Sequence, residues 1–324
     1  MPHFSTVAKR LLLTAAVVIT ACGPVENSPK DSGIAAVDGG STFDAGSELD
    51  SGSSVDSGIT NDAGNTTDAG PTLDGGHVST FHIQFDYQFD TKGMFTDPSH
   101  RAALAAAAKV WETKIRDEFD DVPAGTSLRI RHPEQPYDAG FALTINQPID
   151  DVIIFVGSAP LISGVAATSA PSAALSTVTD PTVQAALAER FNGSHFEPWT
   201  GWISFSDSGR FFFDPTPETA NDIPLDKTDF ISTATHEIGH VLGFGTAAAF
   251  KGHIVSGGFT GSRATTLYGA PVPMSSDGSH VLGSVTFNGQ QLLMDNAASV
   301  SGVRRYPTAL DLAMLEDTGY QFWP

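Results

Sequence analysis

Hydrophobic and polar residues alternate from position 81 to 89, which is the pattern of a half-buried β-strand. From Pro98 the pattern changes, and apolar residues recur at three- and four-residue spacing as far as Phe119. This spacing predicts an amphipathic helix, with Asp97 as its N-cap and proline at its first position. Residues 128–131 and the apolar run 152–156 predict two more strands. The first part of the folded region should therefore combine a sheet with a helix.

Later elements are also visible in the apolar pattern. The stretches 201–205 and 210–213 predict strands, and they precede a helix around His236. The apolar residues of that helix share one side, and we expect the other side, which carries His236, to face away from the core. A final helix is predicted to begin at Thr308, with Asp311 forming an imperfect capping box, and to end at Gly319. The fold class predicted from these elements is α+β.

Composition limits the partners of the chain. It has 324 residues and a formal net charge of -20, which argues against nucleic acid and against polybasic attraction to anionic lipid. Residues 77–324 are enough for one domain with two lobes.

The N-terminal residues predict export. Lys9 and Arg10 precede a short apolar run that is too brief to span a bilayer, so residues 1–21 are interpreted as a signal peptide. The sequence around Cys22 resembles the lipobox of bacterial lipoproteins, in which the new N-terminal cysteine is acylated. Cys22 is the only cysteine, so a disulfide within the chain is excluded. We expect an exported bacterial lipoprotein anchored through Cys22, at the outer membrane or cell surface.

A repeat of six residues follows the proposed anchor. Aspartates recur at this interval from Asp38 to Asp74, each with glycine two residues later. The intervening residues are mostly small or polar, so a β-solenoid would have no core, and the spacing does not match an EF-hand calcium loop. Residues 22–76 are therefore predicted to be a disordered linker.

The strongest chemical signal is the run from His236 to Gly243, which has the pattern HExxHxxG. On a helix, His236 and His240 lie one turn apart on one face, so both imidazoles can bind one ion. In this motif Glu237 does not coordinate the metal but takes a proton from zinc-bound water, which makes it the predicted general base. The predicted cofactor is Zn²⁺.

A catalytic zinc needs a third protein ligand. The gluzincin pattern would use a downstream glutamate, and Glu316 is the first one after His240. The compact metzincin motif would place a histidine where this chain has Thr246. His253 and His280 are the remaining downstream histidines, and Met294 lies in an apolar run beyond them.

The order of HExxHxxGF, a long insertion, a histidine and a Leu-Met pair resembles the leishmanolysin-like branch of the metzincins. The resemblance covers roughly residues 81–324, and it implies a two-lobed zinc peptidase with a mixed sheet, a zinc-binding helix, a methionine turn and a C-terminal helix. It implies that His236, His240 and His280 bind zinc, that Glu237 is the base and that Met294 forms the turn. The chain departs from the protozoan members, which are rich in disulfides.

The expected function is that of a membrane-anchored extracytoplasmic zinc endopeptidase, acting as a monomer on protein or peptide substrates. The resemblance also implies an edge strand that binds extended substrate, for which 201–205 and 210–213 are the candidates. Tyr268, Tyr306 and Tyr320 are candidate donors to the oxyanion. The alternative is a catalytically inactive surface-binding or adhesion lipoprotein that keeps the metzincin scaffold.

Overall fold

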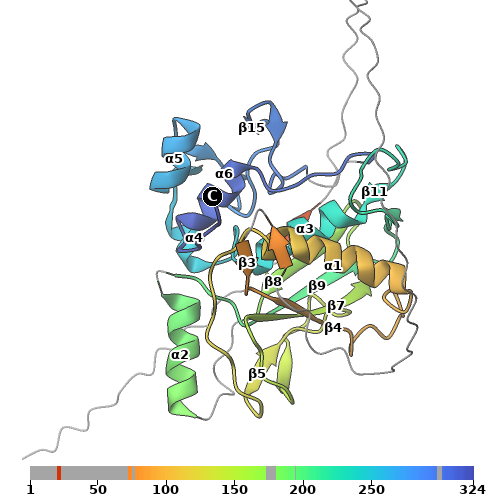
Figure 1. Ribbon diagram of the computed structural model, residues 1–324, viewed down its shortest axis with the longest axis vertical. Coiled ribbons are helices and arrows are strands. Elements are labelled where there is room, and N and C mark those ends of the chain that lie inside the picture. The colour runs from red at the N-terminus through yellow and green to blue at the C-terminus, as the bar shows by residue number, and fades with distance from the viewer. Residues whose placement is uncertain (1–19, 23–71, 75–76, 173–179, 194, 298–300) are drawn as a thin grey trace, which may run out of the picture. The chain divides into compact units, whose positions relative to one another are not determined.

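A computed structural model describes residues 20–22, 72–74, 77–172, 180–193, 195–297 and 301–324. Most of the predicted signal peptide and linker, residues 1–19 and 23–71, lies outside these ranges. The described residues combine a mixed sheet with six helices, which confirms the α+β class (Figure 1). None of these helices has the length and the apolar character that a membrane span requires.

The main sheet has five strands in the order β1-β8-β9-β7-β4, in which β1 is Thr20–Cys22. β4 (Ile83–Asp86), β7 (Val152–Ala159) and β9 (Thr200–Ser206) are parallel to one another, whereas β8 (Ala167–Pro171) is antiparallel to β9. β7 to β9 are buried along almost their whole length, as expected for strands covered on both faces.

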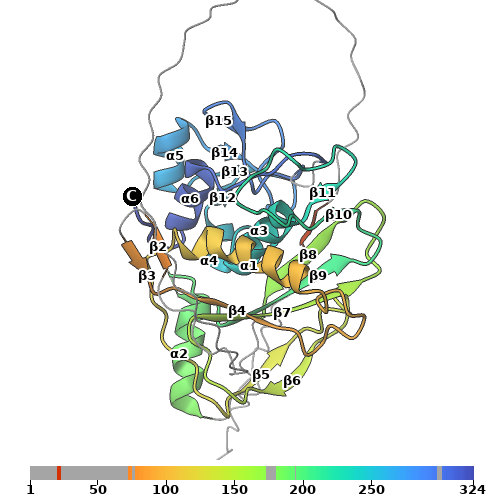
Figure 2. The ribbon, with the colours of Figure 1, turned by 45° about the vertical axis from the view of Figure 1, so that its right-hand side comes forward.

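Two helices, α1 (Pro98–Glu112) and α3 (Phe230–Val241), lie side by side over one face of the sheet (Figures 1 and 2). Their apolar sides form one core with the sheet. Gly201 in β9 shows how close the packing is, because a Cβ atom there would collide with Val241 of α3. Trp111 of α1 is fully buried, and its indole nitrogen donates to the backbone oxygen of Thr235, 2.9 Å away, which links the two helices.

Smaller elements complete the fold. On the other side of the sheet, the loop after β5 (Ser127–Ile130) approaches β9, where the hydroxyl of Ser204 donates to the carbonyl of Pro133. The remaining helices are α2 (Pro181–Asn192), α4 (Ala248–Gly252), α5 (Ser262–Tyr268) and α6 (Ala309–Glu316). The short strands are β5 (Ser127–Ile130), β6 (Phe141–Thr144), β10 (Phe211–Phe212), β11 (Thr228–Asp229), β12 (Ile254–Val255), β13 (Gly258–Phe259), β14 (Val272–Pro273), β15 (Thr286–Phe287) and β16 (Gln290–Gln291).

Two predicted elements are shorter than expected. The alternating run 81–89 contributes only the four residues of β4 to the sheet. α1 starts as predicted, with Asp97 as N-cap and proline at the start, but it ends at Glu112. Ile115 and Phe119 are still buried, because the extended chain after the helix pairs with the C-terminal segment and places both side chains in the core. Apolar periodicity therefore continued beyond the helix that it predicted.

Of the two candidate edge strands for substrate, 201–205 is wrong. Residues 201–205 lie in β9, between β7 and β8, so both edges of that strand are already paired. Residues 211–212 form β10, which pairs with β11 in a separate two-stranded sheet. On this side of the sheet β8 lies next to the outermost strand, β1 (Thr20–Cys22), and the apolar pattern does not predict β8.

N-terminal residues contribute three short strands. β1 (Thr20–Cys22) pairs antiparallel with β8, and β2 (Thr72–Asp74) pairs antiparallel with β3 (His77–Ser79). The β2–β3 hairpin therefore begins inside the segment 22–76 that was predicted to be a disordered linker.

Helix α6 agrees with the predicted start of the last helix. Thr308 is its N-cap, and the reciprocal bonds between Thr308 and Asp311 make a complete capping box. The helix ends at Glu316, and Gly319, with a φ of 113°, lies in the turn that follows. A positive φ favours glycine, which explains why this residue marks the end of the helical region.

Candidate metal centre

The helix that carries the HExxH motif begins at a fixed and charged N-terminus. Asp229 is the N-cap of α3 and accepts a hydrogen bond from the backbone nitrogen of Ser232 at 2.9 Å. Arg304 forms ion pairs with Asp229 at 2.9 Å and with Asp214 at 2.6 Å, and all three side chains are buried. The start of the helix is thereby fixed to two distant segments of the chain.

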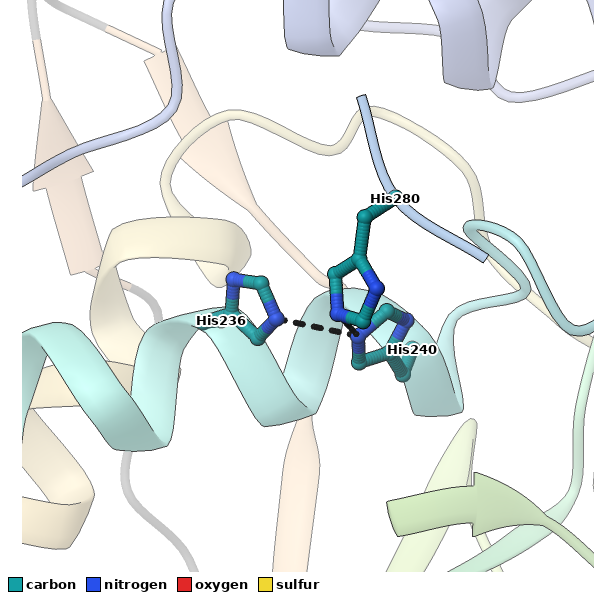
Figure 3. A group of neighbouring side chains, drawn as sticks. All are labelled: His236, His240 and His280. Carbon is teal, nitrogen blue, oxygen red and sulfur yellow. Dashed lines mark hydrogen bonds between the residues drawn. The ribbon is translucent and has the colours of Figure 1, made fainter. Parts of the chain in front are cut away.

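Three histidines converge at one point beside α3 (Figure 3). His236 and His240 lie on α3, and His280 comes from the loop between β14 and β15. The Nε2 atom of His240 lies 3.0 Å from that of His236 and 3.2 Å from that of His280. All three are buried, and among the described residues they are the only group of three or more such side chains that is close enough to bind a metal ion.

The other ring nitrogen of each histidine already has a partner. Nδ1 of His236 lies 2.7 Å from the backbone oxygen of Leu293, and Nδ1 of His240 lies 2.8 Å from that of Phe244. A carbonyl oxygen only accepts, so both Nδ1 atoms carry the proton and both Nε2 lone pairs are free.

The third histidine is oriented through a serine. Nδ1 of His280 lies 3.0 Å from Oγ of Ser279, and that hydroxyl donates to Oδ2 of Asp277 at 2.5 Å. Burial acts to raise the pKa of Asp277, but hydrogen bonds from Ser275 and Ser279 outweigh it and lower the pKa to about 2. The ionised carboxylate of Asp277 accepts the hydrogen bond from the serine hydroxyl, so the serine oxygen accepts a hydrogen bond from Nδ1 of His280. Nε2 of His280 is then unprotonated as well.

A glycine brings the third histidine to the helix. Gly245 has a φ of 66°, and a Cβ atom there would overlap the backbone of Ser279, next to His280. Only a residue without a side chain fits this close approach. The chain after α3 can therefore pass directly beneath the loop that supplies the third imidazole.

The histidines are held in their neutral form. Burial, followed by the neighbouring His240, lowers the pKa of His236 well below its ordinary value. Burial, followed by the neighbouring His280, lowers the pKa of His240 to about 3. Burial, followed by the neighbouring His236, lowers the pKa of His280 to about 3. Neutral imidazole is the form that ligates a metal.

Two of the three separations between these nitrogens match those of a tetrahedral zinc ion. Zinc binds imidazole nitrogen at about 2.0–2.1 Å, which places two tetrahedral ligands about 3.3 Å apart. The observed Nε2 separations of 3.0 and 3.2 Å are close to this value. Three neutral nitrogen donors also leave one tetrahedral position for water or substrate. The donor set is an arrangement that can bind a metal ion.

Glu237 is buried beside His236, which corrects the expectation that this side of the helix faces away from the core. It is wholly inaccessible, because β8 covers this part of α3. Its Oε2 accepts a hydrogen bond from Oγ of Ser169 at 2.7 Å, whereas its Oε1 has no hydrogen-bond partner. Burial raises the pKa of Glu237 to about 8, and the bond from Ser169 acts in the opposite direction.

Met294 lies directly under the helix. It is fully buried, and its sulfur would be 2.6 Å from a Cβ atom on Gly239, which lies between the two ligand histidines of α3. The turn is held from α6, where Asp311 accepts hydrogen bonds from the backbone nitrogens of Leu293 at 3.2 Å and Met294 at 3.1 Å. Asp311 therefore has a second role beside the capping of α6 that its spacing from Thr308 predicts.

The alternative ligands lie elsewhere. Nε2 of His253 lies 2.9 Å from the backbone oxygen of Asp317. Glu316 is 3.6 Å from Arg263 in an ion pair, and the hydroxyl of Thr246 donates to the backbone oxygen of His240 at 2.6 Å. None of the three belongs to the convergent group.

Within the described residues, no hydrogen bond joins the three candidate tyrosines to the histidines. Tyr306 is exposed, and Tyr268 is half-buried at the end of α5. Tyr320 is buried without a partner for its hydroxyl, and it lines a polar cavity of about 250 Å³ together with Asp117 and Glu197. Its surroundings are therefore those of a different part of the core.

Comparisons with known proteins give no additional information on the site: no protein-family model matches the chain, and no curated protein matches it.

Proposed function

We propose that this protein is a zinc endopeptidase with the two-lobed metzincin plan. The observation that carries the proposal is the convergence of three neutral Nε2 atoms beside a buried carboxylate that has one oxygen without a partner. A structural zinc site is normally closed by four protein ligands, whereas a catalytic site keeps one position open. Three histidines with an adjacent glutamate match the second type.

The proposed reaction is hydrolysis of a peptide bond in a protein or peptide substrate. A bound zinc ion would supply Lewis acidity, polarising the substrate carbonyl and lowering the pKa of a coordinated water towards about 7. His236, His240 and His280 would hold the ion, and their Nδ1 partners fix the orientation of the rings. Oε1 of Glu237 accepts a proton from the attacking water and returns it to the nitrogen of the leaving amine as the C–N bond breaks.

β8 is the proposed docking strand for the substrate backbone. It lies next to α3, and its outer edge is paired with Thr20–Cys22 as an antiparallel strand. An extended substrate can form the same main-chain hydrogen bonds. Cleavage before Cys22 during export would remove two of the three residues that occupy this edge.

The cellular setting is part of the same proposal. Cys22 would be acylated after removal of residues 1–21, and the domain would act as a monomer outside the cytoplasm, at the outer membrane or cell surface. Metabolic labelling with a fatty acid tests this. Cys22→Ser should lose the label and release the protein from the membrane, and a labelled Cys22→Ser variant would contradict the anchor assignment.

The test of the activity is casein cleavage by the purified, zinc-loaded chain. Wild-type cleavage should be lost with a chelator and restored by zinc. Glu237→Gln should keep zinc and lose about 10²–10⁴-fold in rate, the usual contribution of a general base. Glu316→Gln is the matched control, because Glu316 pairs with Arg263 away from the histidines. A zinc-loaded wild-type protein without activity would favour the inactive surface-binding alternative.

A further inference from the structure

Ser169 joins the middle of β8 to the middle of the metal-binding helix. Its hydroxyl oxygen lies 2.7 Å from Oε2 of Glu237 and 2.9 Å from the backbone oxygen of the same residue. Both side chains are completely buried. Ser169 is also fixed by the sheet, where it pairs with Ile203 of β9. The hydroxyl therefore approaches the carboxylate from a rigid strand.

The two oxygens of Glu237 are not equivalent. Oε2 accepts the bond from Ser169, and Oε1 is buried without any partner. A buried polar atom without a hydrogen bond costs about 1–3 kcal/mol, so such an atom calls for an explanation. Rotation about the terminal bond of a glutamate has a broad profile, so the backbone and the helix alone do not select one orientation. A hydrogen-bond donor on one of the two carboxylate oxygens selects one orientation.

We propose that Ser169 is a positioning residue that holds Oε2 of Glu237 and so reserves Oε1 for proton transfer. The inference rests on the proposed peptidase function. Ser169 does not touch the reacting atoms in this arrangement. Its single hydroxyl proton is donated to Glu237, and its fixed place on β8 sets the direction of the carboxylate.

The chain offers a matched control on the same strand edge. Ser172 follows the last residue of β8, and its buried hydroxyl has no hydrogen-bond partner. Ser172→Ala removes the same atom from the same region without changing Glu237. Ser169→Thr keeps the hydroxyl of Ser169 and adds one methyl group. Ser169→Ala removes the donor alone.

The kinetic experiment uses the zinc-loaded full chain and a fluorogenic peptide. Ser169→Ala should lower kcat by about ten- to hundredfold, the usual cost of losing an orienting partner, with KM and zinc content unchanged. Ser169→Thr should restore most of the rate, and Ser172→Ala should match wild type. A wild-type kcat in Ser169→Ala, or a loss confined to KM or zinc content, overturns the inference. So does a zinc-loaded Ser169→Thr as slow as Ser169→Ala.

A double mutant separates positioning from general damage. With Glu237→Gln as the background, Ser169→Ala should cause no further loss of the residual rate, because there is no base left to position. A further loss of similar size would indicate a purely structural role and overturn the inference.

Crystal structures of the metal-loaded variants test the inference without activity. The carboxylate of Glu237 should turn or occupy several positions in Ser169→Ala, and keep one position in Ser169→Thr. An unchanged carboxylate in Ser169→Ala overturns the inference whether or not the protein is a peptidase. In contrast, an active Glu237→Gln variant would refute the base assignment itself, which is a failure of the proposed function.

Discussion

The Nδ1 atom of His236 lies 2.7 Å from the backbone oxygen of Leu293, the residue before Met294. The first histidine of the helix is thus oriented by the turn beneath it. Because Asp311 accepts hydrogen bonds from the backbone nitrogens of the same two turn residues, the orientation of His236 depends on α6 as well. Hydrogen bonds therefore link His236 to the turn at Leu293 and Met294, and that turn to the start of α6.

Asp311→Asn should therefore weaken metal binding. In the variant, the NH₂ group of the amide would face a backbone N–H that now donates a hydrogen bond to the carboxylate. Because two donors cannot bond to each other, the turn loses one of the hydrogen bonds that hold it. We expect zinc affinity to fall by about 10- to 100-fold, as for other partners that orient ligands. Titration with a zinc-buffered indicator measures this. Glu316→Gln on the same helix is the control, and equal affinities in the two variants would contradict the role given to Asp311.

His280→Ala should lower zinc affinity by more than about 100-fold, since a lost ligand costs more than a lost orienting partner. His253→Ala should bind zinc like wild type, because His253 contacts the backbone of Asp317 and not the other histidines. Metal analysis after dialysis distinguishes the two variants. A chain that loses zinc with His253→Ala and keeps it with His280→Ala would have a different third ligand.

Sequence predicted the parts of the site that depend on local geometry. The spacing of His236 and His240 on a helix is fixed by the helical repeat, and the capping box of α6 is fixed by residues three apart. The third ligand depends on how a loop folds back over 40 residues, and spacing alone left His253 and His280 open. The resemblance to a family favoured His280, and the structure brings it to the other two.

Sequence did not predict β8 or the burial of Glu237. Residues 167–171 are mostly small and lack the alternation that marks a half-buried strand, because this strand is buried on both faces. Because β8 was not predicted, the helix face that carries Glu237 was expected to be exposed to solvent, and the contact between Ser169 and Glu237 was not predicted. The proline that ends the run was the one available signal of a strand boundary.

Gly239→Ala should destabilise the fold. An added Cβ atom would lie 2.6 Å from the sulfur of Met294 and 3.2 Å from the ring of Trp111, both of which are fully buried. Overpacking of this kind costs about 1–3 kcal/mol. Gly252→Ala is the control, since no atom lies within 4 Å of its added Cβ, and it should leave the free energy of unfolding nearly unchanged. Urea denaturation measures both, and equal stabilities would mean that Met294 moves aside at no cost.

Asp151 should make stability depend on pH. Its carboxylate accepts hydrogen bonds from the backbone nitrogens of His82 at 2.7 Å and Phe119 at 2.8 Å, yet burial raises its pKa to about 7. A carboxyl whose pKa is higher in the folded state binds its proton more tightly there. Its contribution to stability is therefore complete below about pH 4, the ordinary pKa of aspartate, and is lost as the pH rises to about 7.

In that range the free energy of unfolding should fall by at most ~1.4 kcal/mol per pH unit from this group. Asp151→Asn cannot ionise, so the wild type should lose its advantage over the variant between pH 4 and pH 7. Asp121→Asn, at an exposed position, should follow the wild-type curve. Urea denaturation at matched zinc concentration gives the three curves, and parallel curves for wild type and Asp151→Asn would show that this carboxyl titrates alike in the folded and unfolded chain.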